Sequence, residues 1–162
     1  MMTDSKKLLL ALQKEAERWS LEDLYARKNA FKAREYPVES PEYLNQANNI
    51  YNIDVMIMLK EDPGNFFPEN IPSPYYNKFV DAIDSYMDKN APGNTELKDY
   101  IRILELYKTY IAKLPLHPEG LQLPGGGKIY KSGKNYFCTA KQKHIHDENS
   151  MCRFCTAKMC EY

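Results

Sequence analysis

The chain has 162 residues, of which 43% are hydrophobic, and it carries 22 basic and 22 acidic side chains. This length is enough to bury one sizeable core. The even charge balance excludes the strongly basic field that is typical of a dedicated nucleic-acid-binding protein. All 4 cysteines and all 3 histidines lie after residue 114. We therefore expect a helical bundle over residues 1–114 and a smaller Cys/His subdomain over residues 115–162.

Residues 5–113 carry apolar side chains at helical spacing between clear stop signals, which predicts about five helices. Ser20, Ser40 and Ser73 stand where N-caps are expected, and proline follows the last two. The helix after Ser40 is expected to bury one stripe, formed by Leu44, Ala47, Tyr51, Val55 and Met58. The mostly short connections favour an antiparallel arrangement. The predicted fold class is mainly α, an antiparallel helical bundle with a small C-terminal β-hairpin knuckle that binds metal.

The first apolar run, Leu8–Leu12, follows two lysines as in a signal peptide, but polar residues end it too early for one. No later segment approaches the roughly 20 apolar residues that span a bilayer. We therefore expect no membrane association and a cytoplasmic location, where cysteines stay reduced or bind metal.

The pattern changes after Leu114, where prolines and Gly125–Gly127 are incompatible with a helix. Lys128–Tyr130 and Tyr136–Cys138 flank a turn that contains glycine, which predicts a β-hairpin. Such a hairpin would place Cys138 at the end of its second strand.

Cys152 and Cys155 form a C-x-x-C pair, and two thiolates at this spacing can reach one tetrahedral ion. Cys138, arriving from the hairpin, is the third predicted ligand. The pentapeptide Phe-Cys-Thr-Ala-Lys occurs at residues 137–141 and again at 154–158. The repeat is either a pair of similar ligand-bearing turns or a coincidence in a short stretch.

Zinc requires a fourth ligand, and spacing alone leaves four candidates open: Cys160, His144, His146 and His117. An iron–sulfur cluster is the alternative to zinc, because it also uses thiolates. Zinc is favoured because a hairpin followed by C-x-x-C resembles a structural zinc knuckle. A closed site of this kind would stabilise a tail that has too few apolar side chains to form a core alone.

The chain resembles a family of uncharacterised archaeal proteins, found mainly in methanogens and grouped as a domain of unknown function. The resemblance rests on Leu8–Leu24, His117–Gly120, Pro124–Gly126, Tyr136–Cys138 and Cys152–Ala157. It implies a metal set of His117, Cys138, Cys152 and Cys155, and so favours His117 as the fourth ligand. It implies no reaction.

These observations predict a zinc-stabilised cytoplasmic protein that acts as a protein-binding or adaptor module. The first alternative is a metal-dependent enzyme or an iron–sulfur electron-transfer component, with the metal exposed between the knuckle and the helices. The second is a nucleic-acid-binding module that uses the lysines around the cysteines. Neither the catalytic residues nor the identity of a protein partner can be read from the sequence.

Overall fold

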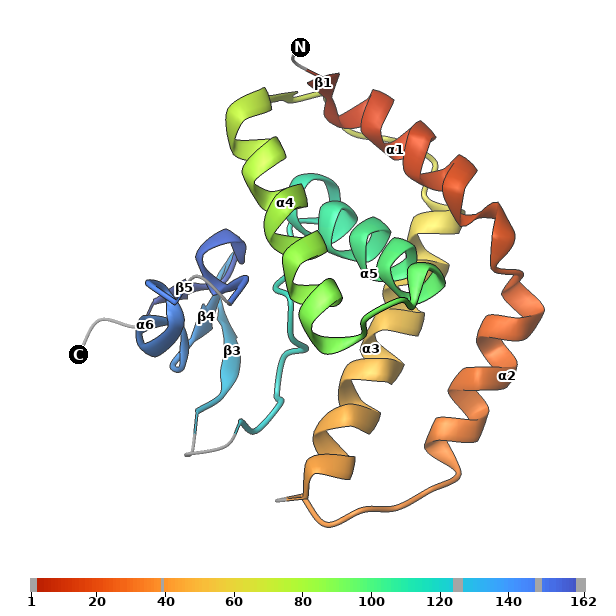
Figure 1. Ribbon diagram of the computed structural model, residues 1–162, viewed down its shortest axis with the longest axis vertical. Helices are drawn as coiled ribbons and strands as arrows, with labels where there is room; N and C mark the ends of the chain where they lie inside the picture. The colour runs from red at the N-terminus through yellow and green to blue at the C-terminus, as the bar shows by residue number, and fades with distance from the viewer. Residues whose placement is uncertain (1–2, 39, 124–126, 148–149, 160–162) are drawn as a thin grey trace.

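The computed structural model describes residues 3–38, 40–123, 127–147 and 150–159, and it is mainly helical with a small C-terminal sheet, as predicted (Figure 1). The helices are α1 Ser5–Glu15, α2 Leu21–Lys32, α3 Pro41–Glu61, α4 Ser73–Asn90, α5 Thr95–Tyr107 and α6 Lys141–His144. Two 3₁₀ turns and one π-helical turn span Ala16–Arg18, Cys152–Phe154 and Lys108–Ala112. The strands are β1 Thr3–Asp4, β2 Asn70–Ile71, β3 Ile129–Ser132, β4 Asn135–Cys138 and β5 Lys158–Met159.

Two of the predicted N-caps are confirmed. The Ser20 hydroxyl accepts a hydrogen bond from the Asp23 N–H at 3.1 Å, and the Ser40 hydroxyl accepts one from the Tyr43 N–H at 3.2 Å. The prediction for Ser73 is wrong by one residue. There α4 already begins at Ser73, because the Pro72 carbonyl accepts the first helical bond, and no side chain caps this end.

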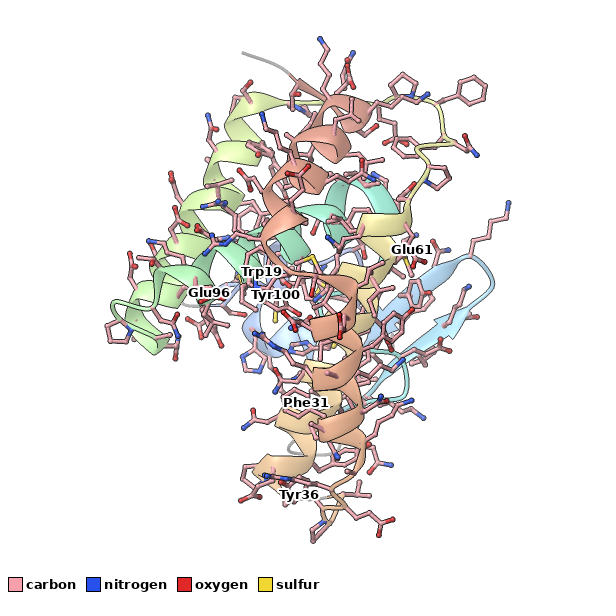
Figure 2. The ribbon with its side chains drawn as sticks, turned by 90° about the vertical axis from the view of Figure 1, so that its right-hand side faces the viewer. Trp19, Phe31, Tyr36, Glu61, Glu96 and Tyr100 are labelled. Carbon is pink, nitrogen blue, oxygen red and sulfur yellow. The ribbon has the colours of Figure 1, made fainter. Side chains whose placement is uncertain are left out.

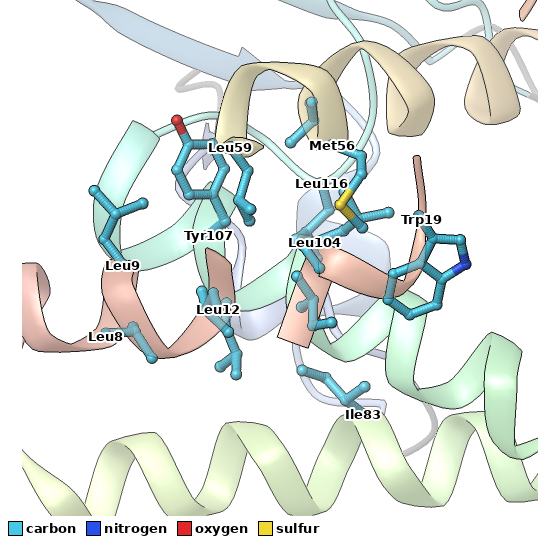
Figure 3. Close-up of a cluster of buried hydrophobic side chains, with 14 of the residues drawn as sticks. Leu8, Leu9, Leu12, Trp19, Met56, Leu59, Ile83, Leu104, Tyr107 and Leu116 are labelled. Carbon is cyan, nitrogen blue, oxygen red and sulfur yellow. The ribbon is translucent and has the colours of Figure 1, made fainter. Parts of the chain in front are cut away.

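The core forms where α1, α3, α4 and α5 meet (Figure 3). The apolar side of α1, formed by Leu8, Leu9 and Leu12, is buried, and Trp19 after the helix is only 4% exposed. On α3 the prediction for Met58 is wrong, since this residue is 46% exposed while Met56 and Leu59 are fully buried. Contacts with α1, α2 and α5 bury α3 on more than one side, so its inner surface is wider than a single stripe.

The C-terminal end of α5 runs through the middle of this core. Every residue from Ile103 to Thr109 is buried, including the charged Glu105 and Lys108. The helix then widens into the π-helical turn and ends at Lys113, whose φ of 55° is left-handed. The chain leaves the core here and runs towards the sheet.

The predicted β-hairpin is confirmed: β3 and β4 pair antiparallel from Ile129↔Cys138 to Ser132↔Asn135. Gly133 has a φ of 62° in the tight turn, a conformation that glycine adopts without strain. The sequence did not predict a third strand. In the structure β5 lies parallel to β4 and pairs Cys138 with Met159.

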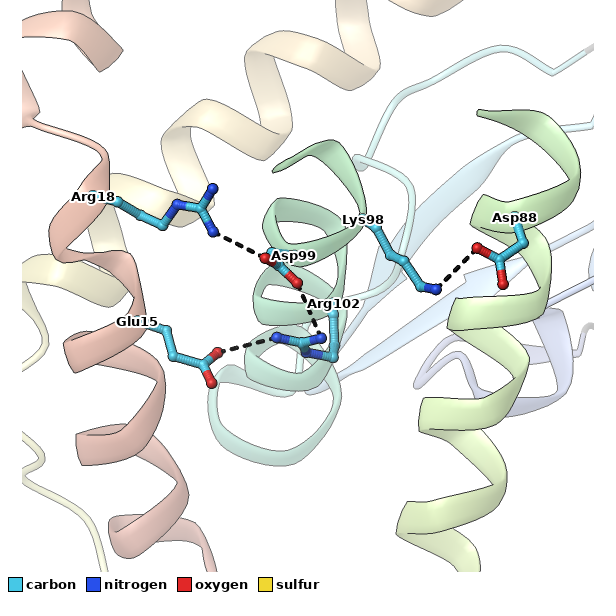
Figure 4. Close-up of polar contacts among 6 residues, drawn as sticks. All are labelled: Glu15, Arg18, Asp88, Lys98, Asp99 and Arg102. Atoms are coloured by element: carbon cyan, nitrogen blue, oxygen red, sulfur yellow. Dashed lines mark hydrogen bonds and ion pairs between the residues drawn. The ribbon is translucent and has the colours of Figure 1, made fainter. Parts of the chain in front are cut away.

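Surface ion pairs also join α5 to the 3₁₀ turn after α1 and to α4, and one lies within α5 (Figure 4). Asp99 on α5 pairs with Arg18 at 2.9 Å and with Arg102 at 3.2 Å. Between α4 and α5, Lys98 and Asp88 lie 2.9 Å apart. Such exposed pairs contribute at most about 1 kcal/mol each, so they orient the helices more than they stabilise them.

The C-terminal segment contributes side chains to two buried clusters. Leu116 and Phe154 belong to the helical core, where the Phe154 ring stacks on Phe79 with centroids 4.7 Å apart. A second cluster is centred on the sheet and consists of Leu121, Ile129, Cys138 and Ala157. Within the described ranges, no helix combines the length and the apolar character that crossing a membrane requires. The division of the chain at residue 114 stays a prediction.

Candidate functional site

A small cavity lies between the end of the helical part and the C-terminal sheet. It has a volume of about 20 Å³ and is lined by Pro115, Leu116, His117, Ile129, Cys138, Lys141, Cys152 and Cys155. This volume suits one water-sized or ion-sized guest. The structure therefore brings all four side chains of the implied metal set, His117 and the three cysteines, to the wall of one cavity.

The C-x-x-C pair is held by a single tight turn. The Cys155 N–H donates to the Cys152 carbonyl at 3.1 Å, and the Cys152 N–H donates to the Ser150 hydroxyl at the same distance. The intervening Phe154 points into the helical core. Because a bulky buried side chain fixes the middle of the turn, both cysteines are held at the edge of the cavity.

The thiol of Cys155 lies in a polar backbone environment although it is largely buried. Burial raises its pKa, while the N–H groups of Leu116 and Ala157 and the ammonium group of Lys141 act in the opposite direction. The Leu116 N–H lies 3.3 Å from the Cys155 sulfur. Backbone N–H groups aimed at a sulfur stabilise it when it is a thiolate, which is the form that binds metal.

Lys141 holds the backbone around the cysteines. Its ammonium group donates to the carbonyls of Cys155 and Ala157, at 2.8 and 2.7 Å. Cys138, the last residue of β4, is buried and faces the same cavity. Within the described ranges, Cys138, Cys152 and Cys155 form no disulfide with one another.

His117 follows Leu116 in the segment that leaves the helical core. Its burial and the nearby charge of Lys108 lower its pKa to about 4. The imidazole is therefore neutral at neutral pH, which is the form that coordinates a metal. The alternative ligands His144 and His146 are exposed and do not line the cavity.

Two elements of the sequence prediction, Cys160 and Pro124–Gly126, lie outside the described residues. Among the residues that the structure does describe, no three His, Cys, Asp or Glu side chains are arranged as a ready metal-binding group. The four implied ligands share a cavity, but they would have to close around an ion to bind it.

The two copies of Phe-Cys-Thr-Ala-Lys have different conformations. Residues 137–141 leave β4 and enter α6, whereas residues 154–158 leave a 3₁₀ turn and enter β5. Thr139 accepts a hydrogen bond from the Lys128 N–H at 2.8 Å, but the buried Thr156 hydroxyl has no partner within the described part of the chain. The repeat therefore does not produce two equivalent turns.

A buried polar network lies directly behind the cavity. The ammonium group of Lys108, a residue only 1% exposed, contacts Glu105 at 2.9 Å and Asn52 at 2.7 Å, and donates to the Leu116 carbonyl at 3.1 Å. Leu116 is thus held by Lys108 through its carbonyl and by Cys155 through its N–H. The network couples the core of the helical part to the wall of the cysteine cavity.

Tyr51 completes this network. Its ring lies 4.8 Å from the Lys108 ammonium group, and its hydroxyl donates to the Pro115 carbonyl at 2.5 Å. Burial, and next the charge of Glu105, raise the pKa of Tyr51. Lys108 and Glu105 were not among the predicted site residues. Two charged residues in the most apolar part of a predicted helix were a signal that could have revealed a buried pair.

Comparisons of the sequence with known proteins identify its family. The profile of the family described as "Uncharacterized protein conserved in archaea (DUF2115)" matches residues 4–159. A UPF0305 protein of Methanocaldococcus jannaschii is 30% identical over 95% of both chains, and one of Methanothermobacter thermautotrophicus is 26% identical over 93% of both. A UPF0305 protein of Methanopyrus kandleri is 27% identical over 62% of this chain and 70% of its own.

No solved structure matches the chain. The relatives' names mention no ligand, reaction or partner. The family match extends from β1 to β5 and so includes the helical part, the hairpin and the C-x-x-C turn. As the resemblance of the sequence indicated, the chain belongs to the archaeal DUF2115 family.

Proposed function

We propose that Cys138, Cys152, Cys155 and His117 bind one zinc ion, and that this ion holds the C-terminal segment against the antiparallel helical bundle. The observation that carries the proposal is the shared cavity: side chains from three separate segments line a space of about 20 Å³. Three thiols and one imidazole are a donor set that zinc prefers in structural sites.

The surroundings of the cavity support a structural metal. The Leu116 N–H is directed at the Cys155 sulfur, and Lys141 carries positive charge beside three thiols that would be deprotonated in the bound state. The neutral imidazole of His117 needs to lose no proton before it binds. A ligand set with four protein donors leaves no position for a substrate, so we propose no reaction for the ion.

The role that follows is that of an adaptor or protein-binding module in the cytoplasm, a reducing compartment that keeps thiols available for metal. The ion would fix the C-x-x-C turn, and with it Phe154, which fills a place in the helical core beside Phe79. A partner-binding surface formed jointly by the helical part and the C-terminal segment would then depend on the metal. Metal loss is expected to loosen residues 115–159 before the helices unfold.

The test is elemental analysis and an ultraviolet–visible spectrum on the full chain purified without oxygen, followed by exchange of the metal for Co²⁺. We expect about one zinc per chain and a colourless protein, with thiolate-to-cobalt bands after the exchange. The Cys152→Ser, Cys155→Ser variant should lose the metal. His117→Ala should weaken its retention during dialysis against a chelator, because one of four ligands is removed.

His144→Ala and His146→Ala are the matched controls, because both histidines are exposed and lie off the cavity. If one of these controls lost as much metal as His117→Ala does, the histidine replaced in it, in or next to α6, would be assigned as a ligand in place of His117. Iron with sulfide and a brown colour would replace the zinc proposal with an iron–sulfur centre. A chain that holds no metal after anaerobic purification with added zinc would refute the proposal.

A further inference from the structure

A second concave surface lies far from the cysteines along the chain. A groove of about 710 Å³ opens between α2, α3 and the first turn of α5. Its volume falls within the range of about 300–1,000 Å³ that is usual for ligand sites. Figure 2 shows Trp19 and Tyr100 side by side at one end, with Phe31 on α2 and Tyr36 beyond the end of this helix.

One face of each of two helices lines the groove. On α2 the lining residues are Arg27, Ala30 and Phe31, with Arg34 just beyond its end, and on α3 they are Glu42, Asn45, Gln46 and Asn49. The α3 set has the i, i+3, i+4, i+7 spacing of a single helical stripe, and the three α2 residues have the i, i+3, i+4 spacing. The stripe of α3 is polar and rich in amides, although α2 lies beside it. A face of this composition is suited to a polar guest rather than to the core.

Only one of these amides has an evident role in the fold. The Gln46 side chain donates to the carbonyls of Phe31 and Arg34, and so ties α3 to the end of α2. Asn49 donates only to the Asn45 carbonyl of its own helix, at 2.8 Å. The Asn45 side chain is exposed and lines the groove. Both asparagines are exposed at the groove, so their amides are available to an occupant.

The spacing of Asn45 and Asn49 matches an extended peptide. Residues four apart on a helix are separated by ~6 Å along its axis. Backbone groups on one side of an extended chain recur every ~6.8 Å. A side-chain amide presents its NH₂ donor and its carbonyl acceptor side by side, as one residue of an extended chain presents its N–H and C=O on the same edge. The stretch of α3 from Glu42 to Ile53 that lines the groove is ~16 Å long, which corresponds to about five extended residues.

The charges along the groove are balanced. Arg27, Arg34, Glu42 and Glu96 line it, and none of them forms an ion pair with another described residue. Complementarity to two cations and two anions favours an occupant of low net charge over a polyanion or a polycation. The aromatic end, where the Trp19 and Tyr100 rings meet edge to face at 5.3 Å, suits a large apolar side chain.

We propose that this groove binds an extended segment of a partner protein, about five residues long and of low net charge. Asn45 and Asn49 hydrogen-bond its backbone, and one aromatic or large aliphatic side chain packs beside Trp19 and Tyr100. The inference rests on the proposed adaptor function, for which it supplies the partner class. It does not rest on the metal, because every lining residue precedes Leu114.

The test selects a phage library of random peptides on the full chain and then titrates a capped synthetic copy of the strongest binder. Trp19 is the only tryptophan of the chain and lines the groove, so its emission reports occupancy directly. We expect the peptide to change this emission. We also expect the Asn45→Ala, Asn49→Ala variant, and likewise N-methylation of the peptide backbone, to weaken binding at least about tenfold.

Asn90→Ala is the matched control. Asn90 is exposed and donates to the carbonyl four residues before it at 2.8 Å, as Asn49 does, but it lies on α4 and does not line the groove. This variant should bind like the wild type. Alanine favours the helix at all three positions, so loss of binding in the double variant cannot result from unfolding of α3.

Three results would overturn the proposal: no enriched peptide, binding that leaves Trp19 emission and the double variant unchanged, or N-acetyl-phenylalanine amide binding as tightly as the peptide. The last result would indicate a small-molecule site. The titration is repeated on the Cys152→Ser, Cys155→Ser variant. Peptide binding that persists there supports the groove, while metal analysis alone decides the zinc proposal.

Discussion

Replacement of Lys108 by methionine is the most informative single perturbation of this protein. Methionine retains most of the volume of the lysine stem but removes the charge. In the wild type the ammonium group contacts Glu105, Asn52 and the Leu116 carbonyl, at 2.9, 2.7 and 3.1 Å. In the Lys108→Met variant the carboxylate of Glu105, a residue only 4% exposed, loses its cation. The side-chain oxygen of Asn52 and the carbonyl oxygen of Leu116 lose the same donor.

The expected cost is about 4 kcal/mol, because removal of one partner of a buried ion pair destabilises a protein by about 3–5 kcal/mol. Domains of this size have unfolding free energies of about 5–15 kcal/mol, so the variant should fold with much reduced stability. Removal of both charges should be far milder. The Glu105→Leu, Lys108→Met variant leaves no unpaired charge and should recover most of the loss.

The assay is urea denaturation of metal-loaded protein at pH 7, followed by helical circular dichroism, with unfolding free energies compared by linear extrapolation. Lys113→Met is the control for the same substitution at an exposed pair, since the Lys113 and Glu69 side chains are 53% and 66% exposed. It should cost at most about 1 kcal/mol. If Lys108→Met cost no more than this control, the argument that the buried network anchors Leu116 would be refuted.

Three further predictions concern the core, a helix cap and a buried tyrosine. Phe154→Ala should cost about 3–5 kcal/mol in the same assay, because the ring is 6% exposed, whereas Phe67→Ala, at a residue 94% exposed, should cost almost nothing. Ser40→Ala should cost about 1 kcal/mol and lower the Tm, because α3 loses its cap, while Ser85→Ala within α4 should not. Burial raises the pKa of Tyr100 to about 12 from the ordinary 10.0, so its contribution to stability is complete below pH 10 and is lost as the pH rises towards 12. Tyr100→Phe should therefore show a shallower alkaline decline of Tm, and an unchanged decline would contradict the assignment.

Local sequence signals predicted much of the secondary structure. The caps at Ser20 and Ser40 and the hairpin with its tight glycine turn depend on interactions within a few residues, and all are confirmed. Predictions that depended on neighbours in space were less successful. The burial of Met58 was predicted from one helical stripe, but three other helices contact α3 and decide which of its sides are covered.

The same distinction applies to the candidate site. Clustering and spacing selected Cys138, Cys152 and Cys155, and the family resemblance implied His117 as the fourth ligand. The tertiary structure brings these four residues to one cavity. The sequence could not reveal the packing of Phe154 on Phe79, nor the contacts of Lys108 with Asn52 and Leu116, since these join residues distant along the chain.

By itself, the amino-acid sequence determined the helical class, the hairpin and the choice of candidate ligands. Each of these follows from backbone propensity, from periodicity, or from the chemistry of a residue type. Only the tertiary structure decided that Lys108 is buried beside the cysteine cavity and that Asn45 and Asn49 line a groove. The physical reason is that burial and hydrogen-bond partners depend on which surfaces meet in space. The residues of one segment do not show which other segments pack against it.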